Sequence, residues 1–292
     1  MESFIPEQKP KFGKIDAYAD FQSNYVTSRH IEVWLPEHYR NDGSFEVFYI
    51  HDGQMLFDPK TTWNGSAWLV DQVSQKWMND GKVRDFIVVG IWNGGATRHI
   101  DYFPQKPYNL LNRDQKNKIT KMLIEAGKIT SDFNPISDDY LKFLTQELKP
   151  FIDKKYNIKT DRASTYVGGA SMGGLISWYA QMEYPDVFGG AACMSTHWPG
   201  TFQLEDNDFP YATRLYLKHK IQDLTNQKIY FDYGNDNLDR LYPPLQSEIN
   251  IIMTEYPPSL WRALLFDGHD HSEASWHSRF HYPLEFLFGK NN

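Results

Sequence analysis

One short segment limits the possible folds more than any other part of the chain. Residues 164–168 (STYVG) have the composition of a buried strand, and residues 175–184 that of a helix. Between them stand residues 169–174 (GASMGG), where small side chains at both ends allow a sharp turn from strand to helix. Such a turn raises the hydroxyl of Ser171 above the sheet, so Ser171 is a candidate nucleophile. A glycine-rich turn without a catalytic role is the alternative.

The rest of the chain alternates between strand and helix patterns. Residues 86–91 (FIVVGI) are apolar throughout, as in a parallel strand that is covered on both faces. Further strands are predicted at 29–36, 45–50, 190–194, 228–233 and 262–266, and further helices at 137–151, at 245–256 and around 284–287. This alternation predicts an α/β protein with a mostly parallel central sheet and helices on both faces. We find no repeat or linker, so residues 1–292 are expected to form a single α/β-hydrolase domain.

The stretch of residues 105–135 breaks this rhythm. It is polar and weakly periodic, and it carries Lys116, Lys118 and Lys121. We interpret it as an insertion over the sheet edge that is either a lid or an ordinary surface excursion. In the helix that follows, Ser137 is the expected N-cap residue, with two aspartates at the positive end of the helix.

Charge, apolar runs and the cysteine count limit the partners and the cellular locations that we expect for the chain. The net charge is −7 and no basic block occurs, which argues against a nucleic-acid partner. The sequence contains no run of 18 apolar residues that could span a membrane, and residues 1–7 lack a signal-peptide pattern. A cytoplasmic location is expected for the chain as written, or a periplasmic or secreted one if a signal peptide has been removed. Cys193 has no second cysteine to pair with and lies in an apolar run, so a buried, inert thiol is expected. Composition does not predict the oligomeric state.

A serine hydroxyl needs a base to remove its proton before it can attack. Two histidines, His269 and His271, follow the last predicted strand. We favour His271 because it lies further into the loop, and His269 is the alternative. No metal site is predicted, because two histidines at this spacing need further ligands and no nearby cluster supplies them.

The acid that orients the base should follow the preceding strand. Residues 234–239 (GNDNLD) offer Asp236 and Asp239, and one of the two is expected to cap the next helix instead. Either gives the chain order Ser, Asp, His that is typical of α/β-hydrolases. The oxyanion formed on attack needs two backbone N–H donors. We expect these from Met172, after the nucleophile, and from Gln54, in the loop that follows residues 45–50.

Several segments carry a family resemblance over nearly the whole chain. They are residues 33–36 (VWLP), 51–58 (HDGQMLFD), 89–93 (VGIWN), 169–174 (GASMGG), 195–199 (STHWP), 232–234 (DYG), 238–239 (LD) and 271–273 (HSE), with Trp276. In these motifs the chain resembles the putative esterase family of α/β-hydrolases, which includes feruloyl and acetylxylan esterases, S-formylglutathione hydrolase, siderophore esterases and mycolyltransferases.

The resemblance implies ester hydrolysis through an acyl-enzyme, with no metal and no organic cofactor. It implies Ser171 as the nucleophile, His271 as the base and Gln54 as an oxyanion donor. Some family members place the acid where this chain has Asn237, which is not an acid. A subgroup carries Leu-Asp after that loop, which favours Asp239 over Asp236.

Five residues next to the motifs are candidates to contact the substrate: Trp92, Asn93, Arg98, Trp198 and Trp276. They suit acyl or aryl esters of carbohydrates, because flat rings stack on sugars and on aryl groups; the alternative is that they brace the catalytic loops. The main hypothesis is a serine carboxylic ester hydrolase acting on a small-molecule or oligosaccharide ester. The other two are an acyltransferase with the same triad and a non-catalytic binding protein that retains the fold.

Overall fold

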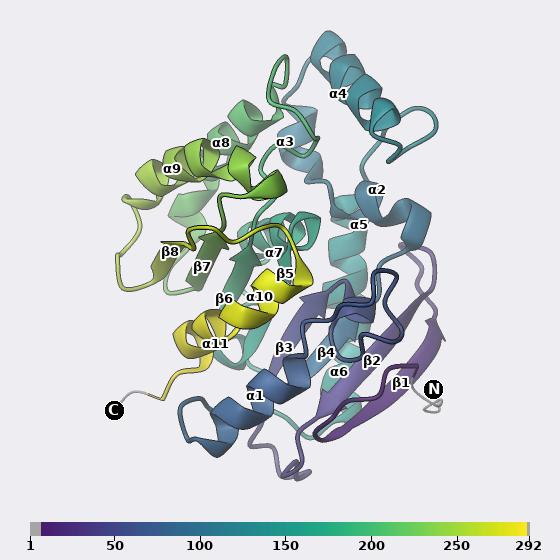
Figure 1. Cartoon of the computed structure of the whole chain (residues 1–292), viewed down its shortest axis with the longest axis vertical. Helices are drawn as coiled ribbons and strands as arrows, with labels where there is room; N and C mark the ends of the chain where they lie inside the picture. The colour runs from purple at the N-terminus through teal and green to yellow at the C-terminus, as the bar shows by residue number, and fades with distance from the viewer. Residues whose placement is uncertain (1–6, 291–292) are drawn as a thin grey trace.

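The computed structural model describes residues 7–290. The signal-peptide prediction concerned residues 1–7, and residues 1–6 lie outside this range. It contains one eight-stranded sheet with the strand order β1-β2-β4-β3-β5-β6-β7-β8 (Figure 1). The strands are β1 (Lys14–Phe21), β2 (Arg29–Leu35), β3 (Glu46–His51), β4 (Phe86–Ile91), β5 (Thr165–Ala170), β6 (Gly190–Met194), β7 (Lys228–Tyr233) and β8 (Trp261–Leu265). The pairs β1–β2 and β2–β4 are antiparallel, and the other five pairs of neighbouring strands are parallel. The predicted mostly parallel sheet is confirmed.

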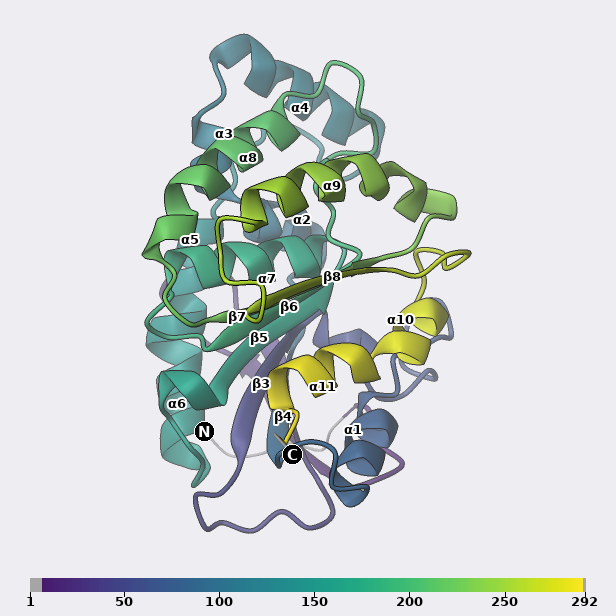
Figure 2. The same ribbon diagram turned by 90° about the vertical axis from the view of Figure 1, so that its left-hand side faces the viewer.

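Helices cover both faces of the sheet, and each face has its own apolar core. Figure 2 shows α1, α10 and α11 on one face and α5 to α9 on the other. The helices are α1 (Val70–Asn79), α2 (Arg98–Tyr102), α3 (Gln105–Asn109), α4 (Arg113–Glu125), α5 (Ser137–Lys142), α6 (Lys149–Lys155), α7 (Met172–Glu183), α8 (Phe209–Lys220), α9 (Tyr242–Met253), α10 (Glu273–Arg279) and α11 (His281–Phe288). Within the described range, no helix combines the length and the apolar character that crossing a membrane requires.

Strand β5 and helix α7 form the centre of the molecule. All six residues of β5 are buried, and α7 is buried from Met172 to Met182. A side chain at Gly168 would come within 2.7 Å of the Phe48 ring of β3, so glycine allows the two strands to pack closely. The junction between β5 and α7 is therefore held on all sides.

The stretch of residues 105–135 is more regular than its sequence suggested. It contains α3 and α4, and α4 begins with a capping box between Asn112 and Gln115. Ile119, Met122 and Leu123 form a short buried stripe at helical spacing. The polar residues around this stripe concealed its periodicity. In Figure 1 the insertion lies beside α8.

The prediction that Ser137 caps its helix is wrong. Ile136 occupies the N-cap position, and Ser137 is the first helical residue. The hydroxyl of Ser137 is buried and accepts a hydrogen bond from the backbone N–H of Gln105 at 2.9 Å, so it joins α5 to the start of α3. The predicted helix over residues 137–151 is present as α5, a π-helical turn (Phe143–Leu148) and α6.

Candidate active site

Ser171 lies in a strained turn at the centre of the molecule. Its backbone has φ 59° and ψ −125°, which is unfavourable for a residue with a side chain. The Ser171 N–H donates to the Met194 carbonyl at 3.0 Å, and the Ser171 carbonyl accepts from the His197 N–H at 3.2 Å. A side chain at Gly169 would come within 2.7 Å of the Gly173 backbone, so the turn closes only with glycine there. The surrounding backbone therefore holds Ser171 at the carboxyl end of β5.

The structure brings His271 and Asp239 together. The Nδ1 atom of His271 lies 2.5 Å from Oδ1 of Asp239, whose side chain is fully buried. The other carboxylate oxygen of Asp239 accepts from the Gly234 N–H at 2.7 Å and from the Ser195 hydroxyl at 2.6 Å. A carboxylate with three hydrogen-bond partners has one fixed orientation, and it fixes the imidazole of His271 in turn.

The two alternative residues, Asp236 and His269, have other contacts. Asp236 is exposed, and its side chain accepts from the Asn237 N–H at 2.7 Å at the start of a 3₁₀ turn (Asn237–Leu241). The ring of His269 packs against Phe266 with centroids 5.5 Å apart. The carbonyl of His269 accepts from the N–H groups of Asn235 and Asp236, both at 3.1 Å. His269 thus ties the Asp236 loop to the His271 loop.

A buried group of side chains supports Asp239 from behind. The Ser195 hydroxyl accepts from Nε1 of Trp276 at 3.0 Å and from Arg279 at 2.7 Å. Arg279 also pairs with buried Asp232 at 3.1 Å. Burial raises the pKa of Asp232, and the Arg279 charge opposes this only in part. Sequence reasoning missed Arg279, because nothing near it in the chain indicates that it reaches the acid loop.

Tyr242 and His197 form a second buried pair beside the site. The Tyr242 hydroxyl lies 2.8 Å from Nδ1 of His197, and the Tyr242 ring meets the His271 ring edge-on at 5.8 Å. Burial raises the pKa of Tyr242 well above its usual value, an effect that the Asp239 charge reinforces and a hydrogen bond with the Ser171 side chain opposes. Burial also lowers the pKa of His197 well below its usual value. This pair is therefore polar but uncharged near neutral pH.

The loop after β3 is wedged between β4 and the serine turn. Asp52 adopts a left-handed backbone conformation, and a 3₁₀ turn (Gly53–Met55) follows it. A side chain at Gly53 would meet the Gly90 backbone at 2.6 Å, and one at Gly173 would meet the Asp52 carboxylate at 3.0 Å. This close packing fixes the backbone N–H of Gln54. The N–H of Met172 lies in the first turn of α7, where backbone donors have no partner within the helix.

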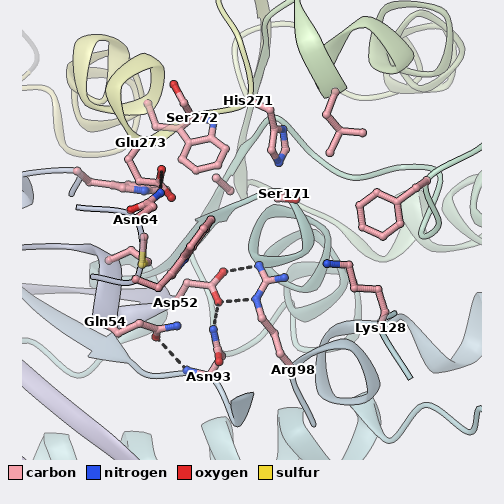
Figure 3. Close-up of a pocket in the computed structure, with 17 residues that line it drawn as sticks. Asp52, Gln54, Asn64, Asn93, Arg98, Lys128, Ser171, His271, Ser272 and Glu273 are labelled. Carbon is pink, nitrogen blue, oxygen red and sulfur yellow. Dashed lines mark hydrogen bonds and ion pairs between the residues drawn. The ribbon is translucent and has the colours of Figure 1, made fainter. Parts of the chain in front are cut away.

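Arg98 and Asn93 hold the Asp52 carboxylate. The guanidinium of Arg98 binds both carboxylate oxygens at 2.7 Å, and the Asn93 amide donates to one of them at 2.7 Å (Figure 3). Burial alone would raise the pKa of Asp52, but the charge of Arg98 and these hydrogen bonds hold it below its ordinary value. The Asn93 N–H also donates to the Gln54 side chain at 3.2 Å. Arg98 and Asn93 therefore brace the Gln54 loop.

We expect Arg98→Met to lower kcat for ester hydrolysis roughly tenfold or more, because the freed Asp52 carboxylate no longer fixes the Gln54 loop. The free energy of unfolding should fall by about 3 kcal/mol, since a largely buried carboxylate loses its partner. Esterase kinetics and chemical denaturation measure both effects. Arg98→Lys keeps the charge without the two-point geometry. It should therefore lower kcat clearly but lower the free energy of unfolding only slightly. Normal kcat in Arg98→Met would show that the loop does not depend on this ion pair.

Two buried histidines near this loop should make the fold sensitive to acid. Burial lowers the pKa of His51 to about 3 and that of His99 to about 4. Both values lie below that of an exposed histidine, about 6.5, so the unfolded chain binds more protons between these pH values. Each histidine therefore contributes stability that is present above about pH 6.5 and is lost as the pH falls toward the folded-state value.

His99→Gln should reduce this dependence on pH. Nε2 of His99 lies 3.0 Å from the Gly200 carbonyl, and the glutamine amide can donate to the same oxygen. Between pH 6 and 4.5, the variant should lose stability less steeply than the unmodified protein, by up to about 1.4 kcal/mol per pH unit. Urea denaturation across this range measures the slopes, with exposed His219→Gln as the matched control. Equal slopes in all three proteins would contradict the lowered pKa of His99.

A cavity of about 550 Å³ opens at the serine turn. Several expected residues line it together, namely Gln54, Asn93, Arg98, Ser171, His271 and Trp276. Others in the lining were not anticipated from the sequence: Trp63, Asn64, Trp68, Lys128, Phe202 and Glu273. Trp63 is 84% exposed at the rim, while Glu273 accepts from the Asn64 amide at 2.8 Å. These residues come from separate loops, so no single motif reveals them.

Two of the tryptophans proposed for the substrate cleft lie elsewhere. Trp198 is only 1% exposed, and its Nε1 donates to the Gln246 side chain at 2.8 Å. Trp92 packs against His30 with ring centroids 4.5 Å apart, outside the cavity lining. Both follow strand ends in the sequence, but their rings turn toward packing partners. The structure therefore corrects the expectation that Trp92 and Trp198 line the cleft.

The mostly parallel sheet and a serine turn at the end of its central strand define the chain as an α/β-hydrolase. The model of the family described as "Putative esterase" matches residues 23–287, and the chain belongs to this esterase family.

Three comparisons illustrate its relatives. The chain is 26% identical over 173 residues to the uncharacterized protein YbbA of Bacillus subtilis (strain 168), a match that spans 59% of this chain and 58% of YbbA. Its structure is similar to that of a ferulic acid esterase, with TM-score 0.63, 19% identity and coverage of 94% and 98% of the two chains. It is also similar to the siderophore hydrolase EstA from Aspergillus nidulans, with TM-score 0.66, 13% identity and coverage of 96% and 97%. At these identities the two structures support the fold alone.

Proposed function

We propose that the chain is a serine carboxylic ester hydrolase that acts through an acyl-enzyme. The observation that carries this proposal is the 2.5 Å contact between His271 and buried Asp239, at a cavity that the strained Ser171 also lines. A residue in an unfavourable backbone conformation persists only where its surroundings enforce it, and such residues cluster at active sites. Membership of the esterase family agrees with this chemistry.

In the proposed reaction, the Ser171 hydroxyl attacks the ester carbonyl while Nε2 of His271 accepts its proton. Asp239 holds the imidazole through Nδ1 and stabilises its positive charge. The backbone N–H groups of Gln54 and Met172 stabilise the oxyanion. The alcohol leaves with the proton from His271, and the acyl group remains on Ser171. A water molecule, deprotonated by His271, then attacks the acyl-enzyme. The bond to the Ser171 oxygen breaks as His271 returns the proton to that oxygen, and the acid product leaves.

The walls of the cavity favour an ester with a ring next to the reacting bond. Trp63, Trp68 and Trp276 present aromatic surface, and Glu273 and Asn64 supply polar groups beside it. Flat rings stack on sugars and on aryl groups alike. We therefore propose acyl or aryl esters as substrates, including esters of oligosaccharides. The ferulic acid esterase and the siderophore hydrolase that share the fold are named for substrates of their own. We therefore include a ferulate ester and a siderophore among the substrates to be assayed.

The experiment is a set of hydrolysis assays on the unmodified protein. Rapid mixing with p-nitrophenyl acetate should give a burst of nitrophenol, because acylation precedes slower release by water. Side-by-side assays of methyl ferulate, acetylated xylan fragments, S-formylglutathione and a catecholate siderophore would then rank the ester classes. Product analysis with and without an acceptor alcohol separates hydrolysis from acyl transfer. No burst and no turnover of any ester would contradict the proposal and favour a binding protein.

A further inference from the structure

The insertion between α2 and α5 brings one lysine to the cavity. Lys128 follows α4, and it lines the same cavity as Ser171 and His271. In Figure 3 its ammonium group points toward Arg98, on the Ser171 side of the cavity. Its Nζ atom lies 5.0 Å from the centre of the Phe202 ring, a cation–π distance. The insertion thus places a positive charge next to an aromatic wall.

The turn after α4 fixes the direction of Lys128. Gly127 has φ +66°, a left-handed conformation that favours glycine. The Lys128 N–H donates to the Leu123 carbonyl and the Gly127 N–H to the Ile124 carbonyl, both at 2.9 Å. This pair of bonds is a Schellman motif, which stops the helix and reverses the chain. Lys128 therefore leaves the helix on a defined path toward the cavity.

The other charged groups near the cavity already have partners. Arg98 is paired with Asp52, and Glu273 accepts from Asn64. Two lysines of α4 pair away from the site, Lys118 with Asp206 and Lys121 with Glu125. For Lys128, no carboxylate of residues 7–290 lies within ion-pair distance. Its charge is available to a ligand.

We propose that Lys128 is a specificity-determining residue that selects ester substrates carrying a carboxylate or a similar small anion away from the reacting ester bond. This inference rests on the proposed esterase function. A cavity of about 550 Å³ has the size of a small-molecule site, so one substrate can reach both Ser171 and Lys128. A charge-assisted hydrogen bond to an ammonium group is stronger than a neutral one, and Phe202 packs against the carbon frame beside the anion.

Matched ester pairs test the proposal. Mono-(4-nitrophenyl) adipate and 4-nitrophenyl hexanoate place the negative or neutral group on the acyl side, and 4-acetoxybenzoate and 4-methylphenyl acetate place it on the alcohol side. In at least one pair, Lys128→Gln should lower kcat/KM for the anionic ester roughly tenfold relative to the neutral one. The preference is the ratio of kcat/KM for the anionic ester to kcat/KM for the neutral one. Lys128→Arg should largely preserve this ratio, and Lys128→Glu should lower it more than Lys128→Gln does. Added salt should lower the ratio in the unmodified protein.

The control is Lys121→Gln, which removes an equal charge from the same insertion outside the cavity lining. It should leave the ratio of the two kcat/KM values unchanged. If Lys128→Gln leaves both ratios unchanged while the neutral esters are hydrolysed by Ser171, the proposal for Lys128 is overturned and the esterase function stands. If Ser171→Ala hydrolyses the neutral esters as fast as the unmodified protein, the proposed function itself fails.

Discussion

Replacing Ser171 with alanine is expected to lower kcat for ester hydrolysis by roughly 10³-fold or more. The substitution removes the attacking oxygen but leaves the oxyanion donors and the cavity in place. Because the turn depends on its glycines and backbone hydrogen bonds, the Ser171→Ala protein should fold normally. Steady-state rates with p-nitrophenyl acetate measure the loss, and a thermal melt checks the fold.

Exposed Ser278→Ala on α10 is the matched control and should keep its activity. We predict that Ser171→Ala retains only slow hydrolysis, without a burst of nitrophenol. If the Ser171→Ala protein folds and its kcat is within a few fold of that of the unmodified enzyme, another group attacks the ester.

The second large effect separates the two aspartates of the acid loop. Asp239→Asn should lower kcat by roughly 10² to 10⁴-fold, because an amide cannot stabilise the charged imidazole and can favour the wrong tautomer of His271. Asp236→Asn should change kcat by less than about threefold, since asparagine caps a helical turn about as well as aspartate. The two substitutions make the same chemical change three residues apart, so each controls for the other.

A loss of stability in Asp239→Asn could imitate a catalytic role, because buried Asp239 has several hydrogen-bond partners. Rates should therefore be measured well below the Tm of each variant. Equal activity in the two variants, or a greater loss in Asp236→Asn, would move the acid away from Asp239. In the same way, near-normal turnover in His271→Ala would move the base to His269.

Local patterns predicted the fold class and the candidate residues of the proposed triad, but spacing alone did not choose between Asp236 and Asp239. The turn around Ser171 is readable because its glycines and its flanking strand and helix are contiguous. Asp236 and Asp239 are equivalent in spacing, and burial separates them only once the chain folds. Strand β1 and helices α1 and α8 were not predicted. The buried face of α1 mixes Asp71, Ser74 and Gln75 with Val70 and Met78, so its apolar stripe is weak.

Contacts between distant segments were beyond sequence reasoning. Arg279 supports Asp239 from the end of α10, 40 residues further along the chain. Lys128 was overlooked in favour of other lysines of the insertion, because the turn at Gly127 redirects the chain after the helix ends. Trp198 shows the opposite error, since its position after a strand suggested a cleft residue and its ring packs in the core.

Covalent labelling of the unmodified protein with a fluorophosphonate, followed by peptide mass spectrometry, tests directly whether Ser171 is the nucleophile. We predict one adduct per chain, on the oxygen of Ser171, with loss of esterase activity in proportion to labelling. The adduct should be absent from Ser171→Ala and should form much more slowly in His271→Ala. Labelling of a different residue, or full esterase activity in a protein that is completely labelled at Ser171, would contradict the assignment of Ser171 as the nucleophile.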